Sequence, residues 1–370
     1  MKKILFIVLG DNLNGTERYV LDIIRYLPTD IFDAYFGIPY DSRLNLILQS
    51  HNVKTFNFRN DTLKKFRFKG IINIARFIIK NKIDIIHSNS GIIPCIIGKL
   101  LGASRCYETR HGIFYTDKQL ASFTLMQKYH EKIKQYFVDF QIVISENDKE
   151  RLMKCFEISE EKIKVIYNGI DIESVTEKGR RTENGIIIPE EKFKFLNIGR
   201  LTYQKGQNVL IEAANLLQKE RQNFTLTITG EGEDHSQLQS LIDKYKLNNI
   251  VKIESYMEDI YEFIKEHDAL VMTSRYEGVP YVVLESMALG VPVIHTDVGG
   301  ISNILTDRLD GMIAKQEDAI DFMKKMLELL NDFNLYKSLR DNAFKTIQSY
   351  TIEKMVSQYV SLYLNENTYE

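Results

Sequence analysis

Short apolar runs rich in β-branched residues alternate along the chain with segments whose apolar residues recur every three or four positions. The first helical segment illustrates the second pattern: its apolar positions fall at i, i+3, i+4 and i+7 between Val20 and Leu27, and Pro28 then ends the helix. This alternation predicts an α/β protein with parallel sheets. The runs that we expect to form strands are residues 4–9, 83–87, 137–144, 193–198, 224–229, 250–254, 269–273 and 291–295.

The chain is long enough for two domains. Its 370 residues, 44% of them apolar, exceed what one ordinary core requires. Residues 171–191 are the most polar and least periodic segment, so we expect them to link an N-terminal domain, residues 1–170, to a C-terminal domain, residues 192–350. A final amphipathic helix within residues 351–370 is expected to pack back on the N-terminal domain.

Both domains begin in the same way. In each, a strand is followed by a glycine, a polar loop, a second glycine and a helix, from Gly10 to Gly15 and from Gly199 to Gly206. Two such units facing each other would form a cleft.

The cysteines and the first residues of the chain indicate the cellular compartment in which we expect the protein. Only Cys95, Cys106 and Cys155 occur, without CxxC spacing, which argues against a disulfide framework or a thiolate metal site and favours the cytoplasm. The basic and apolar start imitates a signal peptide, but its apolar run, residues 4–9, is short and no small-residue cleavage site follows. No segment approaches the roughly 18 apolar residues that span a bilayer, so we expect no integral membrane protein.

Charge is unevenly distributed. Residues 1–180 hold 28 Lys and Arg against 21 Asp and Glu, whereas the remainder holds 20 against 29. Residues 43–82 alone carry ten cations and one acid, Asp61. The cations are Arg43, Lys54, Arg59, Lys64, Lys65, Arg67, Lys69, Arg76, Lys80 and Lys82, and the interleaved aromatics are Phe56, Phe58, Phe66, Phe68 and Phe77.

Two interpretations of this basic segment stay open. It can dock peripherally on anionic lipid at the inner face of the plasma membrane, where each cation contributes about 1 kcal/mol, or it can be a solvated basic face. Nucleic acid is the poorest third option, because the acidic C-terminal half would repel a phosphate backbone.

Two glutamates in residues 273–290 carry the most informative pattern. Pro280 suits the first turn of a helix, so Glu277 lies in the preceding loop and Glu285 about one and a half turns inside the helix. The neighbours of Glu285 three and four positions away are apolar or aromatic. A carboxylate on such a stripe needs a partner, because unpaired burial costs about 2–7 kcal/mol even for neutral polar groups. Ribose hydroxyls would satisfy it; an internal salt bridge or helix cap is the alternative.

A second pattern lies in residues 199–206, between a strand and a helix. Loops at the carboxyl edge of a parallel sheet gather ligands. Arg200 can fork onto phosphate oxygens and Lys205 can act as a compact charge, both beside a helix N-terminus that favours anions. Alone, this pattern would indicate a solvated loop; together with the two glutamates it predicts a diphosphate site.

These motifs resemble those of retaining glycosyltransferases of family 4. The similarity covers nearly the whole chain and is strongest from Phe193 to Gly300. It implies the GT-B fold, in which two Rossmann-like domains with parallel sheets face each other across a cleft. The segments that carry it are Glu277-x7-Glu285, Gly199-Arg200-Leu201 with Lys205-Gly206, Gly230-Glu231-Gly232, residues 285–293, and residues 165–171, which resemble the family's interdomain crossover.

The resemblance also implies roles for residues. Glu285 would bind the donor ribose, Glu277 the hydroxyls of the transferred sugar, and Arg200 with Lys205 the diphosphate. The implied catalytic residues are Glu277, Arg200, Lys205 and His111, the last beside the donor sugar. The expected donor-binding residues are Gly15, Thr16, Arg200, Lys205, Tyr256, Met257, Gly278, Tyr281, Val282 and Glu285; Tyr256 and Met257 are placed near the base by their position after a strand.

One motif departs from the family pattern. Where relatives often have two glycines followed by an acid, this chain has Asn14-Gly15-Thr16-Glu17. The glycine that lets the backbone approach a phosphate is kept.

The implied activity is transfer of a hexose or N-acetylhexosamine from a nucleotide-diphosphate sugar to a lipid-linked or saccharide acceptor in envelope polysaccharide or glycolipid synthesis. We expect a UDP-sugar donor, because such donors are commoner among similar enzymes. No metal or other cofactor is expected, and the chain has no Asp-x-Asp motif. For retention we favour attack on the front face, with the leaving phosphate accepting the acceptor's proton.

Other functions stay open. The acceptor could be small and soluble. Non-hydrolysing nucleotide-sugar epimerases share the fold, although Glu277-x7-Glu285 argues against them, and a nucleotide-sugar sensor without turnover is a further alternative. A dinucleotide-dependent oxidoreductase would need G-x-G-x-x-G after the first strand, whereas residues 10–15 lack the middle glycine.

Overall fold

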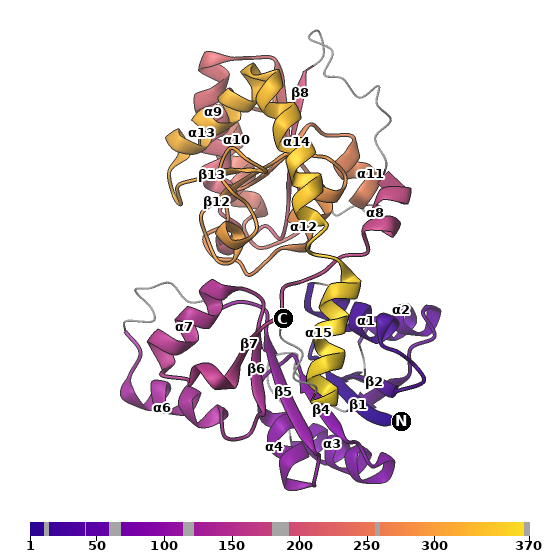
Figure 1. Ribbon diagram of the computed structural model, residues 1–370. Helices are drawn as coiled ribbons and strands as arrows, with labels where there is room; N and C mark the ends of the chain where they lie inside the picture. The colour runs from indigo at the N-terminus through magenta and orange to yellow at the C-terminus, as the bar shows by residue number, and fades with distance from the viewer. Residues whose placement is uncertain are drawn as a thin grey trace. The chain divides into compact units, whose positions relative to one another are not determined.

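The computed structural model describes residues 1–10, 15–40, 42–58, 68–113, 122–179, 192–255 and 260–365. The chain divides into two compact units, which we call unit 1 (Met1–Gly169 with Ile352–Glu370) and unit 2 (Ile170–Thr351). Each is built around one sheet of parallel strands (Figure 1). None of the helices in the described ranges combines the length and apolar character that crossing a bilayer requires.

The sheet of unit 1 has seven strands in the order β3-β2-β1-β4-β5-β6-β7. Its strands are β1 (Lys2–Ile7), β2 (Phe32–Pro39), β3 (Thr55–Phe58), β4 (Ile85–Ser88), β5 (Arg105–Arg110), β6 (Phe140–Val143) and β7 (Ile163–Val165). Its helices are α1 (Gly15–Tyr26), α2 (Leu44–Ser50), α3 (Phe68–Asn81), α4 (Ile93–Leu100), α6 (Leu125–Lys134), α7 (Glu146–Phe156) and α15 (Ile352–Leu364), with the 3₁₀ turn η1 (Glu160–Lys162).

The sheet of unit 2 has six strands in the order β10-β9-β8-β11-β12-β13. Its strands are β8 (Phe193–Ile198), β9 (Phe224–Thr229), β10 (Val251–Glu254), β11 (Ala269–Met272), β12 (Val293–Thr296) and β13 (Met312–Ala314). Its helices are α8 (Ile172–Gly179), α9 (Gln207–Glu220), α10 (His235–Lys244), α11 (Ile260–Lys265), α12 (Tyr281–Ala288), α13 (Ala319–Asn331) and α14 (Phe333–Ile347), with the 3₁₀ turns η2 (Tyr203–Lys205) and η3 (Ile301–Asn303).

Both sheets reverse their strand order beside their first strand. β1 lies between β2 and β4, and β8 lies between β9 and β11. In a doubly wound sheet this switch point opens a crevice at the carboxyl ends of the two central strands. The predicted α/β class with two Rossmann-like parallel sheets is confirmed, and the strand order reverses at β1/β4 in unit 1 and at β8/β11 in unit 2.

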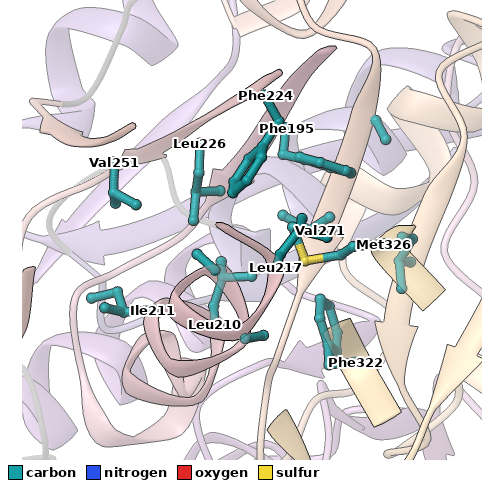
Figure 2. Packing of buried hydrophobic residues seen from close by; sticks show 14 of the residues in the cluster. Phe195, Leu210, Ile211, Leu217, Phe224, Leu226, Val251, Val271, Phe322 and Met326 are labelled. Carbon is teal, nitrogen blue, oxygen red and sulfur yellow. The ribbon is translucent and has the colours of Figure 1, made fainter. Parts of the chain in front are cut away.

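The core of unit 2 forms where α9 and α13 meet the sheet. Alternate residues of the strands point to that face, as Phe195 of β8 and Leu226 of β9 do (Figure 2). Burying each such side chain contributes about 1.5–3 kcal/mol. Other members of the cluster are Leu210, Ile211, Leu217, Phe224, Val251, Val271, Phe322 and Met326.

Part of the expected linker is helical. Residues 172–179 form α8, which contacts α11 and α12 and therefore belongs to unit 2. Val175 is fully buried there, so packing of an apolar side chain outweighs the polar composition that led us to expect a linker. The rest of that segment, residues 180–191, lies outside the described residues.

The last helix, α15, is part of unit 1 and packs on α1. Buried polar groups hold it there. The Tyr363 hydroxyl is hydrogen-bonded to Nδ1 of His87 (2.5 Å), and Nε2 of His87 is hydrogen-bonded to Oγ1 of Thr109 (2.7 Å). Burial lowers the pKa of His87 to about 3, so the imidazole is neutral.

The basic segment 43–82 differs from our expectation. Phe58 is fully buried, and Phe56 stacks on Phe77 in the same core (centroids 4.0 Å apart), so these three aromatics do not belong to a docking face. The reason is that Phe56 and Phe58 of β3 and Phe77 of the amphipathic α3 pack in the cluster between the sheet and that helix. Phe68, in contrast, is 76% exposed. Residues 59–67, with Arg59, Lys64, Lys65, Phe66 and Arg67, lie outside the described residues.

Candidate functional site

Two loops meet at the switch point of unit 2. One follows β8 and runs from Gly199 to Gly206; the other follows β11 and runs from Thr273 to Pro280. Hydrogen bonds join them: the Arg275 amide donates to the Gln204 carbonyl (2.8 Å), and the Gln204 side-chain amide donates to the Tyr276 carbonyl (3.0 Å). The two motifs that the sequence places 70 residues apart therefore form one structure.

Two glycines permit the close approach of these loops. Gly206 has a φ of +63°, and a Cβ there would lie 2.2 Å from the Thr273 carbonyl oxygen. Gly299, in the loop after β12, has a φ of +59°, and a Cβ there would lie 1.8 Å from the Glu277 carbonyl oxygen. A side chain at either position would strain the backbone and push the loops apart.

The carboxylate of Glu277 is held through one oxygen. Lys205 Nζ and the Ser274 hydroxyl both donate to Oε1, the hydroxyl at 2.9 Å. Ser274 is itself fixed, because the Thr296 hydroxyl donates to its carbonyl (2.6 Å). No residue in the described ranges bonds the second oxygen, Oε2. Only 8% of the Glu277 side chain is exposed, so its orientation is set by these two donors.

Glu285 lies on α12, which begins at Tyr281. Pro280 occupies the N-cap position rather than the first turn that we expected, so Glu285 is a little more than one turn inside the helix. Its side chain is buried. The first turn of α12, with Tyr281 and Val282, contains no acid and receives no side-chain cap. Its N-terminus therefore keeps the partial positive charge that favours an anion.

Arg200 adds a positive charge to the same edge. The residue is exposed, and its guanidinium donates to Oε1 of Gln204 (3.3 Å). Its backbone is held by Gln207, which donates to the Arg200 carbonyl (3.0 Å). Within the described residues it forms no ion pair. A cation of this kind beside helix N-termini favours binding of a phosphate group.

The remaining expected site residues lie in unit 1 or outside the described residues. Gly15 and Thr16 are the first residues of α1, and His111 follows β5. Nε2 of His111 is hydrogen-bonded to Oδ1 of Asn89 (2.9 Å). Tyr256 and Met257 lie outside the described residues.

The structure thus joins Lys205 directly to Glu277 and places the other expected residues of unit 2 at the same sheet edge. Those residues are Arg200, Gly278, Tyr281, Val282 and Glu285.

Sequence reasoning missed four residues at these edges: Ser274, His295 and Gly299 in unit 2 and Asn89 in unit 1. His295 is buried, and its Nδ1 donates to the Thr296 carbonyl (2.7 Å). Burial lowers its pKa to about 4, so it is neutral at physiological pH. The available signal was position, because each lies at or just after the carboxyl end of a central strand of a parallel sheet.

Comparisons with known proteins agree with this architecture. Residues 13–174 match the family model described as Glycosyltransferase Family 4, and residues 180–346 match the one described as Glycosyl transferases group 1. The Anabaena protein Alr3699/HepE, solved in complex with UDP-glucose, superposes with a TM-score of 0.83 at 19% identity over 99% of this chain and 100% of its own. The family matches and the fold place the chain among glycosyltransferases of the GT-B class.

Two relatives with names that state an activity are similar to this chain. The chain is 26% identical to the UDP-Gal:alpha-D-GlcNAc-diphosphoundecaprenol alpha-1,3-galactosyltransferase of Escherichia coli, over 98% of this chain and 97% of the relative. It is also 26% identical to the amylovoran biosynthesis glycosyltransferase AmsD of Erwinia amylovora, over 59% of this chain and 60% of the relative. The chain belongs to glycosyltransferase family 4.

The contact between Ser274 and Glu277 generates a prediction. Ser274→Ala removes one of the two donors that orient the Glu277 carboxylate, and we expect turnover of the donor sugar to fall about tenfold, the effect of roughly 1.4 kcal/mol. Affinity for the nucleoside diphosphate should not change, because that hydroxyl bonds Glu277. Steady-state kinetics and calorimetry measure the two effects.

Ser286→Ala is the matched control. Ser286 is a buried serine of α12 whose hydroxyl finds no hydrogen-bond partner in the described part of the chain. Its replacement should leave turnover unchanged. Full turnover in Ser274→Ala, or equal losses in both variants, would contradict the orienting role.

Proposed function

We propose that this chain transfers a hexose or N-acetylhexosamine from a UDP-sugar to a lipid-linked or saccharide acceptor, with retention of configuration and without a metal ion. The observation that carries this proposal is the Glu277 carboxylate, whose Oε1 is bound by Lys205 and Ser274 while no described residue bonds Oε2. A buried carboxylate with one immobilised oxygen is suited to fixing sugar hydroxyls. The N-terminus of α12 and Arg200, at the same edge, are suited to a diphosphate.

The roles of the residues follow from the charges that develop. As the bond between the anomeric carbon and the phosphate oxygen breaks, negative charge accumulates on the diphosphate. Arg200, Lys205 and the amides of Tyr281 and Val282 stabilise that charge, and each well-aimed donor contributes about 10²- to 10³-fold in rate. Glu285 binds the ribose. The acceptor hydroxyl attacks from the face that the diphosphate leaves, and its proton passes to a phosphate oxygen, so the nucleoside diphosphate departs protonated.

The named relatives support the donor and acceptor. The Escherichia coli relative is named for UDP-Gal and for an undecaprenyl-diphosphate-linked acceptor, and AmsD is named for synthesis of a polysaccharide. HepE was solved with UDP-glucose. We therefore assign the acceptor to envelope polysaccharide or glycolipid synthesis, with a small soluble acceptor as the alternative.

Incubation with candidate donors tests the reaction. UDP-sugars should raise the melting temperature of the protein, and UDP release should depend on a polyprenyl-diphosphate-linked saccharide and persist in EDTA. NMR of the product should show the anomeric configuration of the donor. A thermal shift with GDP-mannose alone would reject UDP, an inverted product would reject retention, and rearrangement of the sugar without acceptor would indicate an epimerase.

Replacing each of the two glutamates by alanine should have a different effect on the enzyme. Glu285→Ala should lose donor binding, because the ribose loses its carboxylate partner. Glu277→Ala should keep nucleotide affinity within about twofold and lose turnover by about 10²-fold or more, since its partner is the transferred sugar. Calorimetry with UDP and single-turnover kinetics report on the two steps. Equal loss of binding in both variants would remove this division of roles.

We further propose that unit 1 meets an anionic lipid surface through the outer face of α3. This helix contains no acid. Its exposed residues include the cations Lys69, Arg76 and Lys80, and also Phe68 and Ile79, which are 76% and 62% exposed. Cations with neighbouring apolar side chains are the pattern of an interfacial helix, and a lipid-linked acceptor places the enzyme at such a surface.

Flotation with liposomes tests this surface. We expect the protein to float with vesicles of phosphatidylglycerol at low salt, and to float less at high salt because exposed charges are screened. The triple variant Lys69→Ala, Arg76→Ala, Lys80→Ala should stay in the soluble fraction. A control that removes the same charge from unit 2, at the exposed Lys219, Lys244 and Lys246, should float normally. Equal behaviour of the two variants would argue for a solvated basic face.

A further inference from the structure

Asn89 occupies the switch point of unit 1. It follows β4, and its backbone amide donates to the carbonyl of Ile7 in β1 (2.9 Å). The next residue, Ser90, accepts a hydrogen bond from the Leu9 amide (2.9 Å). Both contacts fasten the loop after β4 to β1, so the position of the Asn89 side chain is set by the sheet.

Asn89 presents its side-chain oxygen to the ring of His111. Its Oδ1 lies 2.9 Å from Nε2 of His111. A carbonyl oxygen only accepts hydrogen bonds, so in this arrangement the ring proton is on Nε2. The other ring nitrogen, Nδ1, then keeps its lone pair, and it has no hydrogen-bond partner in the described part of the chain.

The ring of His111 is also fixed from another side. Tyr19 of α1 packs edge-on against it, with ring centroids 4.7 Å apart and an interplanar angle of 84°. Burial lowers the pKa of His111 to about 3, so it is neutral at physiological pH. The titratable groups beside it stay neutral as well, because burial raises the pKa of Tyr19 and lowers that of His87 to about 3.

A second observation marks Asn89 as more than a packing residue. The residue is only 8% exposed, and its buried Nδ2 has no hydrogen-bond partner among the described residues. Leaving such a donor unpaired costs about 1–3 kcal/mol. An apolar side chain would avoid that cost but would give His111 no acceptor.

We propose that Asn89 is a positioning residue that holds His111 as its neutral Nε2–H tautomer, so that Nδ1 accepts a hydrogen bond from a hydroxyl of the donor sugar. This inference rests on the proposed function for its ligand, and on the Asn89–His111 contact alone for its tautomer. Protonated or tautomerised His111 presents N–H at Nδ1 and loses this acceptor.

NMR of the whole wild-type protein tests the tautomer without any assay of activity. Long-range ¹H–¹⁵N correlations distinguish Nε2–H from Nδ1–H, and the His111 signals are assigned by their loss in His111→Ala. We expect the Nε2–H pattern in wild type and a mixture in Asn89→Ala. An Nδ1–H pattern in wild type would overturn the proposal, even if glycosyl transfer is established.

Asn89→Asp separates positioning from a merely structural role. The carboxylate still accepts from Nε2, but its charge favours the imidazolium, so the pKa of His111 should rise from about 3. As the pH falls through that raised pKa, Nδ1 becomes protonated and stops accepting. We therefore expect near-wild-type kcat/KM for the donor at alkaline pH and a tenfold or greater loss at acidic pH. A wild-type pH profile in this variant, with its His111 pKa raised, would overturn the proposal.

A double-mutant cycle completes the test. Asn89→Ala should lower kcat/KM about tenfold in the wild-type background and have no further effect in His111→Ala, because Asn89 acts through His111. If the losses of kcat/KM from the two single substitutions multiply in the double variant, Asn89 acts independently of His111 and the proposal is rejected. Thermal melts of each variant identify misfolding, and the wild-type NMR result stands regardless of how the variants fold. Absence of glycosyl transfer in wild type would reject the proposed function and leave the tautomer assignment intact.

Discussion

The position of β8 between β9 and β11 is the constraint on which the candidate site depends. In a parallel sheet every strand ends at the same edge, and where the strand order reverses, the two central connections leave on opposite faces. The loops after β8 and β11 therefore lie side by side and are joined by hydrogen bonds. Residues as distant in sequence as Lys205 and Glu277 meet there. Unit 1 repeats this arrangement at β1 and β4, where Asn89 lies.

Charge in unit 2 is organised around a carboxylate that is only partly neutralised. Lys205 offsets the charge of Glu277 through Oε1, which makes burial of the carboxylate tolerable, and Ser274 prevents it from rotating. Arg200 has no comparable acid in the described part of unit 2. The site thus combines an oriented acceptor oxygen with an exposed cation, Arg200, and a helix N-terminus, which suits a ligand that carries both hydroxyls and phosphates.

Unit 1 uses neutral polar groups instead. His87 and His111 both have a pKa lowered to about 3 by burial, and both are placed by hydrogen bonds to uncharged partners. Neutral imidazoles offer one donor and one acceptor, and the neighbouring group decides which nitrogen is which. His87 uses both nitrogens within unit 1 and helps to hold α15, whereas among the described residues only Nε2 of His111 has a hydrogen-bond partner.

The amino-acid sequence by itself determined the α/β class, because the alternation of strand and helix periods is local: β8 and β9 begin and end where their apolar runs do. It also placed Glu277, Lys205 and Arg200 in loops that follow strands, because glycines and strand ends mark such loops. Only the tertiary structure decided that Ser274 orients Glu277, that Asn89 orients His111, and that α8 is a helix of unit 2 rather than linker. These outcomes depend on which strands are neighbours and which side chains find partners across them, and local periodicity carries no information about either.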